Sequence, residues 1–317
     1  MQKARLGNSD LLLSRMGIGA WAMGGSGWSF SWSHQDDSDS IAAIHAALDA
    51  GMNWIDTAAV YGLGHSEVVV AKALATYSGA RPYVFTKCER TWDDSRQIIK
   101  SLKPESIQKE CEASLKRLNV DTIDLYQIHW PEPDEDIEAG WDTLLGLQRS
   151  GKVRWIGVSN FNVSQLKRIQ ALGTVTSLQP PYSLVRREVE GEILPYALEQ
   201  NIGVIAYSPM GSGLLTGAMS QERLNNLPSD DWRRKSAMFQ TPLIERNLRI
   251  AEEVKQVASE LNRLPGEVAI AYVLRNPAIT GAIVGFRNAK QVGELSRASD
   301  LDLSDKLYGR LQSAIVA

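Results

Sequence analysis

The chain has 317 residues, of which 44% are hydrophobic and 22% charged, and its formal net charge is −3 at pH 7. This composition is typical of a globular protein with a sizeable core. The small negative charge gives no reason to expect nucleic acid or an anionic membrane surface as a partner. We find no apolar run as long as a membrane span and no signal-peptide pattern at the N-terminus. Two cysteines, Cys88 and Cys111, are too few for a disulfide framework, so we expect a reduced, cytoplasmic protein.

Strand and helix patterns alternate along the chain after a short hairpin, which is predicted over residues 5–15 around the turn at Asn8-Ser9-Asp10. Short apolar segments predict eight strands, over residues 16–20, 53–56, 83–87, 123–129, 153–158, 175–179, 204–207 and 281–285. Amphipathic segments predict the helices between and after them, with Ser38 or Asp39 as the first cap, over residues 39–50, 65–77, 104–119, 137–150, 163–171, 188–200, 243–261 and 266–275 and from about 289.

Eight strand–helix units without a break in composition predict one α/β domain over residues 1–317, a closed (β/α)₈ TIM barrel with an N-terminal β-hairpin. Strands that are apolar on both faces indicate parallel pairing. A doubly wound sheet is the alternative, but the first strand is not followed by the G-x-G-x-x-G motif of dinucleotide-binding sheets. Residues 208–242 are predicted to form a long loop after strand seven, and such loops are usually functional or disordered.

Polar side chains end nearly every predicted strand. The strand ends carry Trp21, Asp56, Lys87, His129, Ser159, Asn160, Gln179, Tyr207, Ser208 and Gly285, and Tyr61 follows in a glycine-flanked loop. Each residue alone has a simple structural explanation, such as a helix cap, a solvated charge or a buried histidine. In a TIM barrel, however, the C-terminal strand ends meet at one mouth. Their convergence there predicts a functional site.

Four of these residues form a candidate catalytic group: Asp56, Tyr61, Lys87 and His129. A free tyrosine titrates near pH ~10, and a lysine ammonium held beside it by an aspartate is expected to lower that pKa. The phenol could then protonate a carbonyl oxygen as a general acid, while a neutral histidine orients the same oxygen. None of these groups can supply a hydride, so a reduction would require a cofactor.

The remaining strand ends are suited to a nicotinamide ring. Ser159, Asn160 and Gln179 can hydrogen-bond a carboxamide, and Tyr207 offers a flat ring for stacking. The segment that follows Tyr207 contains glycines whose backbone N–H groups could bind a pyrophosphate. Its candidate cofactor-binding residues are Ser208, Met210, Gly211, Ser212 and Leu214.

A second phosphate-binding group is predicted after strand eight. Beyond Gly285, the planar guanidinium of Arg287 could bind a 2′-phosphate, with Lys290 nearby. A solvated surface charge beside a helix is the alternative for Arg287.

The chain resembles the aldo-keto reductases over essentially its full length. The matching motifs are Asp-Thr-Ala-Ala-Val-Tyr-Gly (56–62), Phe-Thr-Lys (85–87), Gln-Ile-His-Trp (127–130) and Gly-Lys-Val-Arg-Trp-Ile-Gly-Val-Ser-Asn-Phe (151–161), with Gln179 and Tyr207-Ser-Pro-Met. The likeness is closer to the bacterial general-stress and inositol-operon branch, through Gly64-His-Ser-Glu67 and Val284-Gly-Phe-Arg287.

The resemblance implies that Tyr61 is the general acid, that Lys87 and Asp56 tune it and that His129 orients the carbonyl. It implies NADPH as cofactor, with NADH possible, bound without a Rossmann fold. Gln291 and Glu294 match family positions at the adenosine end, where Leu295 replaces the usual asparagine.

The expected partner is a small-molecule carbonyl compound, and neither a metal nor a particular oligomeric state is predicted. The substrate walls are expected from tryptophans in loops near the mouth: Trp21, Trp28, Trp32, Trp92 and Trp130. Aryl aldehydes and sugars both stack on such rings, so the sequence does not name the substrate.

Two other functions stay open beside an NADPH-dependent carbonyl reductase. One is a cofactor-binding, redox-sensing regulatory subunit similar to the potassium-channel β subunits, in which turnover is incidental. The other is a class I aldolase, in which Lys87 would form a Schiff base with the substrate.

Overall fold

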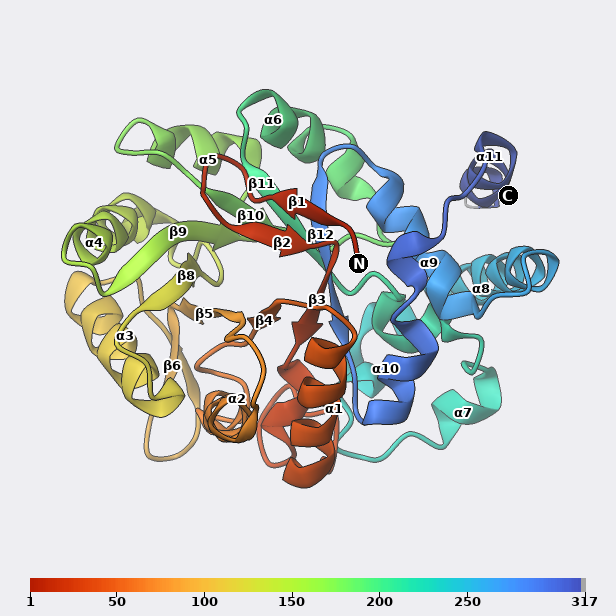
Figure 1. Ribbon diagram of the computed structural model, residues 1–317, viewed down its shortest axis with the longest axis horizontal. Helices are drawn as coiled ribbons and strands as arrows, with labels where there is room; N and C mark the ends of the chain where they lie inside the picture. Colours follow the sequence, from red (N-terminus) through yellow and green to blue (C-terminus); the bar gives the residue numbers. More distant parts are fainter. Residues whose placement is uncertain (315–317) are drawn as a thin grey trace.

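The computed structural model describes residues 1–314, and its centre is a closed barrel of eight parallel strands (Figure 1). The strands follow one another around the barrel in chain order: β3 (Met16–Gly19), β4 (Trp54–Asp56), β5 (Tyr83–Cys88), β8 (Ile123–Ile128), β9 (Val153–Ser159), β10 (Ser177–Gln179), β11 (Gly203–Tyr207) and β12 (Ile279–Gly285). Pairing of β12 with β3 closes the ring. The predicted (β/α)₈ TIM barrel is confirmed.

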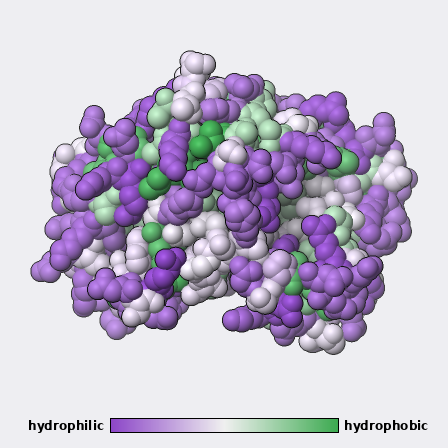
Figure 2. All heavy atoms as spheres, turned by 90° about the horizontal axis from the view of Figure 1, so that it is seen from below, coloured by the Kyte–Doolittle hydropathy of each residue, from purple (hydrophilic) through white to green (hydrophobic). Residues whose placement is uncertain are grey.

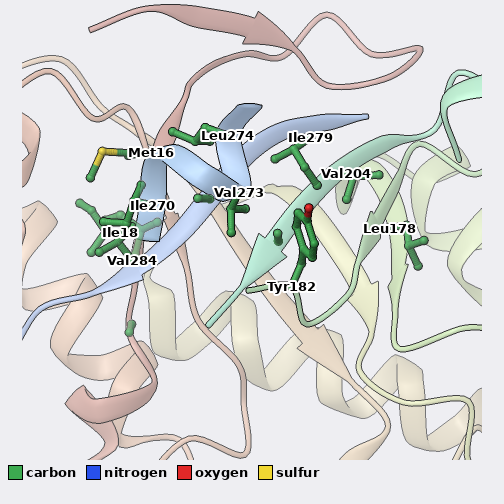
Figure 3. Close-up of a cluster of buried hydrophobic side chains, with 14 of the residues drawn as sticks. Met16, Ile18, Leu178, Tyr182, Val204, Ile270, Val273, Leu274, Ile279 and Val284 are labelled. Carbon is green, nitrogen blue, oxygen red and sulfur yellow. The ribbon is translucent and has the colours of Figure 1, made fainter. Parts of the chain in front are cut away.

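Helices surround the barrel on the outside (Figure 1). They are α1 (Asp37–Asp49), α2 (His65–Thr76), α3 (Pro104–Leu118), α4 (Ile137–Arg149), α5 (Val163–Gln170), α6 (Ile193–Glu199), α8 (Leu243–Glu260), α9 (Pro265–Arg275), α10 (Ala289–Leu295) and α11 (Asp305–Ser313). Helix α9, for example, packs on the barrel wall, where its Ile270 lies beside Val284 of β12 (Figure 3). The face of the molecule in Figure 2 is mainly hydrophilic, with small apolar patches. No helix among residues 1–314 has the length and apolarity to span a bilayer.

The N-terminal hairpin closes one end of the barrel. Strands β1 (Lys3–Arg5) and β2 (Leu12–Ser14) pair antiparallel, as predicted. The fully buried side chains of Leu6, Leu11 and Leu13 pack on apolar residues at the barrel axis: Trp54, Phe85, Leu125, Ile205 and Ile283. Because this end is filled with apolar side chains, the opposite end is left for polar chemistry.

Three elements begin at other residues than predicted. Helix α1 begins at Asp37, and its cap is Asp36 rather than Ser38 or Asp39, since the Asp36 carboxylate accepts from both of those backbone N–H groups. Helix α6 begins at Ile193, after a separate 3₁₀ turn over Glu188–Glu190, so the predicted start at residue 188 was wrong. Strand β10 is shorter than predicted and begins at Ser177.

Two segments have more structure than the sequence indicated. Residues after β5 form a hairpin of β6 (Arg90–Trp92) and β7 (Ile98–Lys100), which the sequence did not show because strands of three residues are too short for a clear alternation. The long segment 208–242 is built of short helices: the 3₁₀ helix η4 (Gly211–Thr216), α7 (Gln221–Asn225), and the 3₁₀ turns η5 (Trp232–Lys235) and η6 (Ala237–Phe239). Each is too short to show a hydrophobic period.

Candidate active site

A buried ion pair lies at the open end of the barrel, between the C-terminal ends of β4 and β5. The ammonium of Lys87 donates to Asp56 Oδ1 at 2.6 Å and to the carbonyl of Thr57 at 2.8 Å. Lys87 and Asp56 are 1% and 3% exposed, so both charges are removed from water. Burial lowers the pKa of Lys87, while the Asp56 carboxylate opposes that shift. A buried pair of this kind is stable only when each charge keeps its partner.

Two buried amides hold the other oxygen of the Asp56 carboxylate. Gln179 Nε2 donates to Asp56 Oδ2 at 2.8 Å, and Gln127 Nε2 lies 3.3 Å from the same atom. Gln127 is not among the site residues predicted from the sequence. A usable signal was its position two residues before His129, because alternate residues of a strand share one face.

Tyr61 lies in the loop after β4, directly beside this pair. Lys87 Nζ is 5.3 Å from the centre of the phenol ring. Burial, and then the negative charge of Asp56, raise the pKa of Tyr61 well above its ordinary value. The lowered pKa expected from the sequence is therefore not found, because burial, the largest cause, acts in the opposite direction. The phenol keeps its proton at neutral pH, which a general acid requires.

His129 follows β8 and faces the tyrosine. Its ring centre is 5.7 Å from that of Tyr61, at an interplanar angle of 76°. Burial lowers the pKa of His129 well below its ordinary value, and the positive charges of Lys87 and Arg90 act in the same direction. The imidazole is therefore neutral at neutral pH, the form expected from the sequence, and can hydrogen-bond a carbonyl oxygen without carrying charge.

The four residues assigned to the nicotinamide ring are connected by hydrogen bonds. Tyr207 OH donates to Asn160 Oδ1 at 2.8 Å, Asn160 Nδ2 donates to Ser159 Oγ at 3.0 Å, and Ser159 Oγ donates to the carbonyl of Gln179 at 2.7 Å. Asn160 also donates to the carbonyl of His129 at 3.0 Å, which connects this row to the catalytic group. Amide and hydroxyl groups held in a row beside the reacting groups fit a carboxamide ligand.

The segment that follows Tyr207 fits a phosphate. Met210 has φ −93° and ψ 15°, and the next residues, Gly211, Ser212 and Gly213, have φ of 58°, 55° and 95°. A right-handed residue followed by a left-handed one makes the concave backbone arrangement that binds anions. Glycine is required at position 211, because a Cβ there would lie 2.8 Å from a methyl of Val185. Leu214 is buried beneath this turn.

Arg233, which was not predicted from the sequence, lies against the same segment. Its Nη1 is 3.5 Å from the carbonyl of Ser212, and its Nε and Nη2 donate to the Asp231 carboxylate at 2.9 and 2.6 Å. The sequence signal was weak, since Arg233 stands in a run of polar residues within the long loop.

At the expected adenosine end, Arg287 is half-buried, so it is not the solvated surface charge of the alternative reading. Its guanidinium donates to Gln35 Oε1 at 2.8 Å and to the carbonyls of Trp32 and His34. The side chain of Gln291 accepts from the Arg287 backbone N–H at 2.9 Å. Lys290 projects into solvent at 85% exposure, and its ammonium is 3.8 Å from Glu294. Gly285 ends β12 beside them and is exposed.

The expected substrate tryptophans separate into two groups. Trp21 stacks at 6.3 Å and 23° on Tyr61, Trp28 lies 6.1 Å from Tyr61, and Trp32 packs edge-on against Trp21 at 5.3 Å. Trp232 of the long loop, which was not predicted, stacks on Trp21 at 5.1 Å. We call Trp21, Trp28, Trp32 and Trp232 the aromatic wall.

Trp92 and Trp130 belong to a different environment. Arg117 lies 5.7 Å from the ring of Trp92, and Arg90 lies 5.4 Å from the ring of Trp130. Within residues 1–314, neither ring pairs with a member of the aromatic wall. Their role in substrate binding stays a prediction.

A TIM barrel with a tyrosine, a buried lysine–aspartate pair and a neutral histidine at its mouth has the groups of a carbonyl oxidoreductase. Comparison with known proteins agrees: the model of the aldo/keto reductase family matches residues 15–316. The chain belongs to this family, whose members act on carbonyl compounds with NAD(P)H.

Individual relatives cover nearly the whole chain. The aldo-keto reductase YhdN of Bacillus subtilis is 36% identical, over 95% of this chain and 88% of its own. An NADH-specific methylglyoxal reductase of Escherichia coli is 32% identical, over 96% of this chain and 95% of its own. Among solved structures, the glycerol dehydrogenase AKR11B4 of Gluconobacter oxydans superposes with a TM-score of 0.89 at 36% identity, over 99% and 95% of the two chains.

Proposed function

We propose that this protein reduces small aldehydes and ketones to alcohols, that NADPH is its preferred cofactor with NADH also accepted, and that Tyr61 is the general acid. The observation that carries the proposal is the buried Asp56–Lys87 pair, 2.6 Å between Oδ1 and Nζ, beside a protonated Tyr61 and a neutral His129. These are the groups needed to polarise a carbonyl oxygen and to protonate it.

The side chains divide the work as follows. When bound, the cofactor supplies the hydride for the carbonyl carbon. Tyr61 donates its phenol proton to the carbonyl oxygen as negative charge develops there. Lys87, 5.3 Å from the ring, stabilises the tyrosinate that remains, and Asp56 keeps the lysine in place. His129, uncharged, hydrogen-bonds the same oxygen and sets its direction.

The cofactor is held by groups that the fold brings together at the mouth. Ser159, Asn160 and Gln179 would hold the carboxamide, with Tyr207 against the ring, and the turn at Gly211 would bind the pyrophosphate. Arg287 supports a preference for NADPH, because its half-buried guanidinium follows β12, where the sequence predicts the 2′-phosphate site. The NADH-specific relative shows that the family also contains the opposite choice.

The substrate class is supported by the aromatic wall, in which Trp21 and Trp28 lie within 6.3 Å of the Tyr61 ring. Indole faces stack on aryl aldehydes and on the C–H faces of small sugars. The names of two relatives, a methylglyoxal reductase and a glycerol dehydrogenase, agree with small and hydroxylated carbonyl compounds.

The test is a panel of aryl, aliphatic and sugar carbonyls, assayed by loss of nicotinamide absorbance with NADPH and with NADH. We expect turnover of several members by the wild type, and turnover at least ~10²-fold slower by Tyr61→Phe. Saturable cofactor binding without turnover of any carbonyl would favour a regulatory subunit. Borohydride trapping of a carbonyl substrate on Lys87 would favour an aldolase.

A further inference from the structure

Arg287 connects the expected adenosine end to the loop that carries three of the four rings of the aromatic wall. This loop, residues 21–36, connects β3 to α1 and includes Trp21, Trp28 and Trp32. Three of its groups accept from the Arg287 guanidinium: Gln35 Oε1 at 2.8 Å, the carbonyl of Trp32 at 3.4 Å and the carbonyl of His34. A planar guanidinium can serve several acceptors at fixed angles, which a lysine cannot do.

The contact between Arg287 and Gln35 is reciprocal. Gln35 Nε2 donates to the backbone carbonyl of Arg287 at 2.8 Å and to Ser40 Oγ at 3.1 Å, while its Oε1 accepts from the guanidinium. Gln35 therefore joins the end of β12 to the start of α1. It is neutral and can be altered without removing a cation from the expected phosphate site.

The loop held in this way reaches the reacting groups through ring contacts. Trp32 packs edge-on against Trp21 at 5.3 Å, and Trp21 stacks on Tyr61 at 6.3 Å. Trp32 also lies 4.7 Å under the guanidinium of Arg233, which contacts the phosphate-binding segment at Ser212. A change in the position of Trp32 would therefore alter the aromatic wall beside Tyr61.

We infer that Arg287 and Gln35 are positioning residues for substrate: together they hold the loop 21–36 so that Trp32 and Trp21 form the wall beside Tyr61. This inference rests on the proposed function and adds a task for Arg287 that does not involve a 2′-phosphate. We call the hydrogen bonds of Arg287 and Gln35 to this loop the clamp. Its loss is expected to weaken carbonyl binding even when the cofactor has no 2′-phosphate.

Gln35→Ala is the main test, with the exposed Asp39→Asn as the matched control on the same side of the barrel. Loss of two or three hydrogen bonds from the loop should raise the carbonyl KM about three- to tenfold, with kcat changed less than about twofold. The KM should rise equally with NADPH and NADH. The control should leave both constants unchanged.

Arg287→Lys keeps the charge but loses the planar guanidinium that serves several acceptors. It should therefore raise the carbonyl KM as Gln35→Ala does. The near-ultraviolet circular dichroism of the cofactor-free protein supplies a readout independent of turnover, since it reports the stacked indoles. We expect the same spectral change in both variants and none in Asp39→Asn. An unchanged spectrum and an unchanged carbonyl KM in Gln35→Ala would overturn the inference. Absence of carbonyl turnover in the wild type would refute the proposed function instead, and the spectra would still decide whether the clamp positions the wall.

Discussion

Carboxylates are buried both at the barrel mouth and behind β5, but the two regions differ in the hydrogen-bond donors that these carboxylates have. At the mouth, Asp56 accepts from Lys87, Gln179 and Gln127. Two residues beyond Lys87, on the side that faces α3, Glu89 is fully buried, and neither carboxylate oxygen has a hydrogen-bond donor among residues 1–314. Arg90 Nε is its nearest cation, at 3.4 Å.

The consequence appears in the pKa values. Burial raises the pKa of Glu89 to about 8, and Arg90 only partly opposes it. On α3, burial likewise raises the pKa of Glu110 to about 7, although Ser106 Oγ donates to one of its oxygens at 3.1 Å. Glu67, equally buried, accepts from Thr86 and Arg117, both at 2.6 Å. The pKa is higher for Glu89, which has no hydrogen-bond donor among residues 1–314, than for Glu110, which has one.

The largest effect is expected when the buried ion pair at the mouth loses one of its two charges. Asp56→Asn would leave the Lys87 ammonium buried without a counterion, and we expect a loss of about 3–5 kcal/mol in the free energy of unfolding. Urea denaturation measures it. The double variant Asp56→Asn/Lys87→Met should lose less than Asp56→Asn alone, because no charge is stranded. A single variant as stable as the wild type would contradict the assignment of a charged pair.

Tyr61→Phe removes the proton donor and leaves the ion pair intact. We expect kcat to fall by at least ~10²-fold, because the proton is needed only as the substrate oxygen becomes negative. Cofactor affinity, measured by quenching of tryptophan fluorescence, should change little. A variant with near-wild-type kcat would remove Tyr61 from the acid role.

Glu89→Gln tests the buried carboxylate that has no hydrogen-bond donor among residues 1–314. In the unfolded chain Glu89 titrates near 4.5, and in the folded protein its pKa is about 8. Below pH 4.5 both states hold the proton. Between these values the unfolded chain releases it and the folded protein does not, so stability falls as pH rises through this window.

In Glu89→Gln we expect a flatter dependence, with a gain over the wild type on the order of 1–3 kcal/mol at the alkaline end. Chemical denaturation at several pH values measures it. Glu105→Gln, an exposed carboxylate on α3, is the control and should follow the wild-type curve. A wild type whose stability is constant across this range would show that Glu89 keeps its charge in the folded state.

The smallest expected effect concerns the segment 208–242, which we predict to close over the bound cofactor. The segment 208–242 is tied to the loop 21–36 by Trp232 N to the carbonyl of Ser31 at 3.2 Å, by Ser33 Oγ to Asp230 at 2.9 Å and by stacking of Trp232 on Trp21. We predict that this segment opens without cofactor and closes over the pyrophosphate with NADPH, so that cofactor release limits turnover.

Limited proteolysis within 208–242 should therefore be slowed by NADPH. Trp232→Ala loses the stack on Trp21, worth about 1 kcal/mol, and the edge contacts with Trp32 and Phe239, so its cleavage without cofactor should be at least about fivefold faster. Cleavage that is the same with and without saturating NADPH would show that the segment is only an insertion.

The sequence alone was enough for the barrel and for several of the side chains at its mouth. Strand–helix alternation is a local property, and the C-terminal ends of barrel strands must converge, so Asp56, Lys87, His129 and Gln179 could be placed together from their positions at strand ends. The hairpin β1–β2 was also visible, because its turn residues and flanking leucines lie close in the chain.

Tertiary structure alone decided the state of each group. The pKa of Tyr61 depends on how much water the folded barrel excludes, and the expected lowering by Lys87 failed for that reason. The partners of Arg287 lie 252 to 255 positions away in the chain, and Trp232 meets Trp21 only when two loops fold onto each other. Long-range contacts of this kind have no period and no fixed spacing, so a local pattern cannot contain them. Residue types and their order determined which groups end the barrel strands, whereas packing determined which of them are buried and which residues they contact.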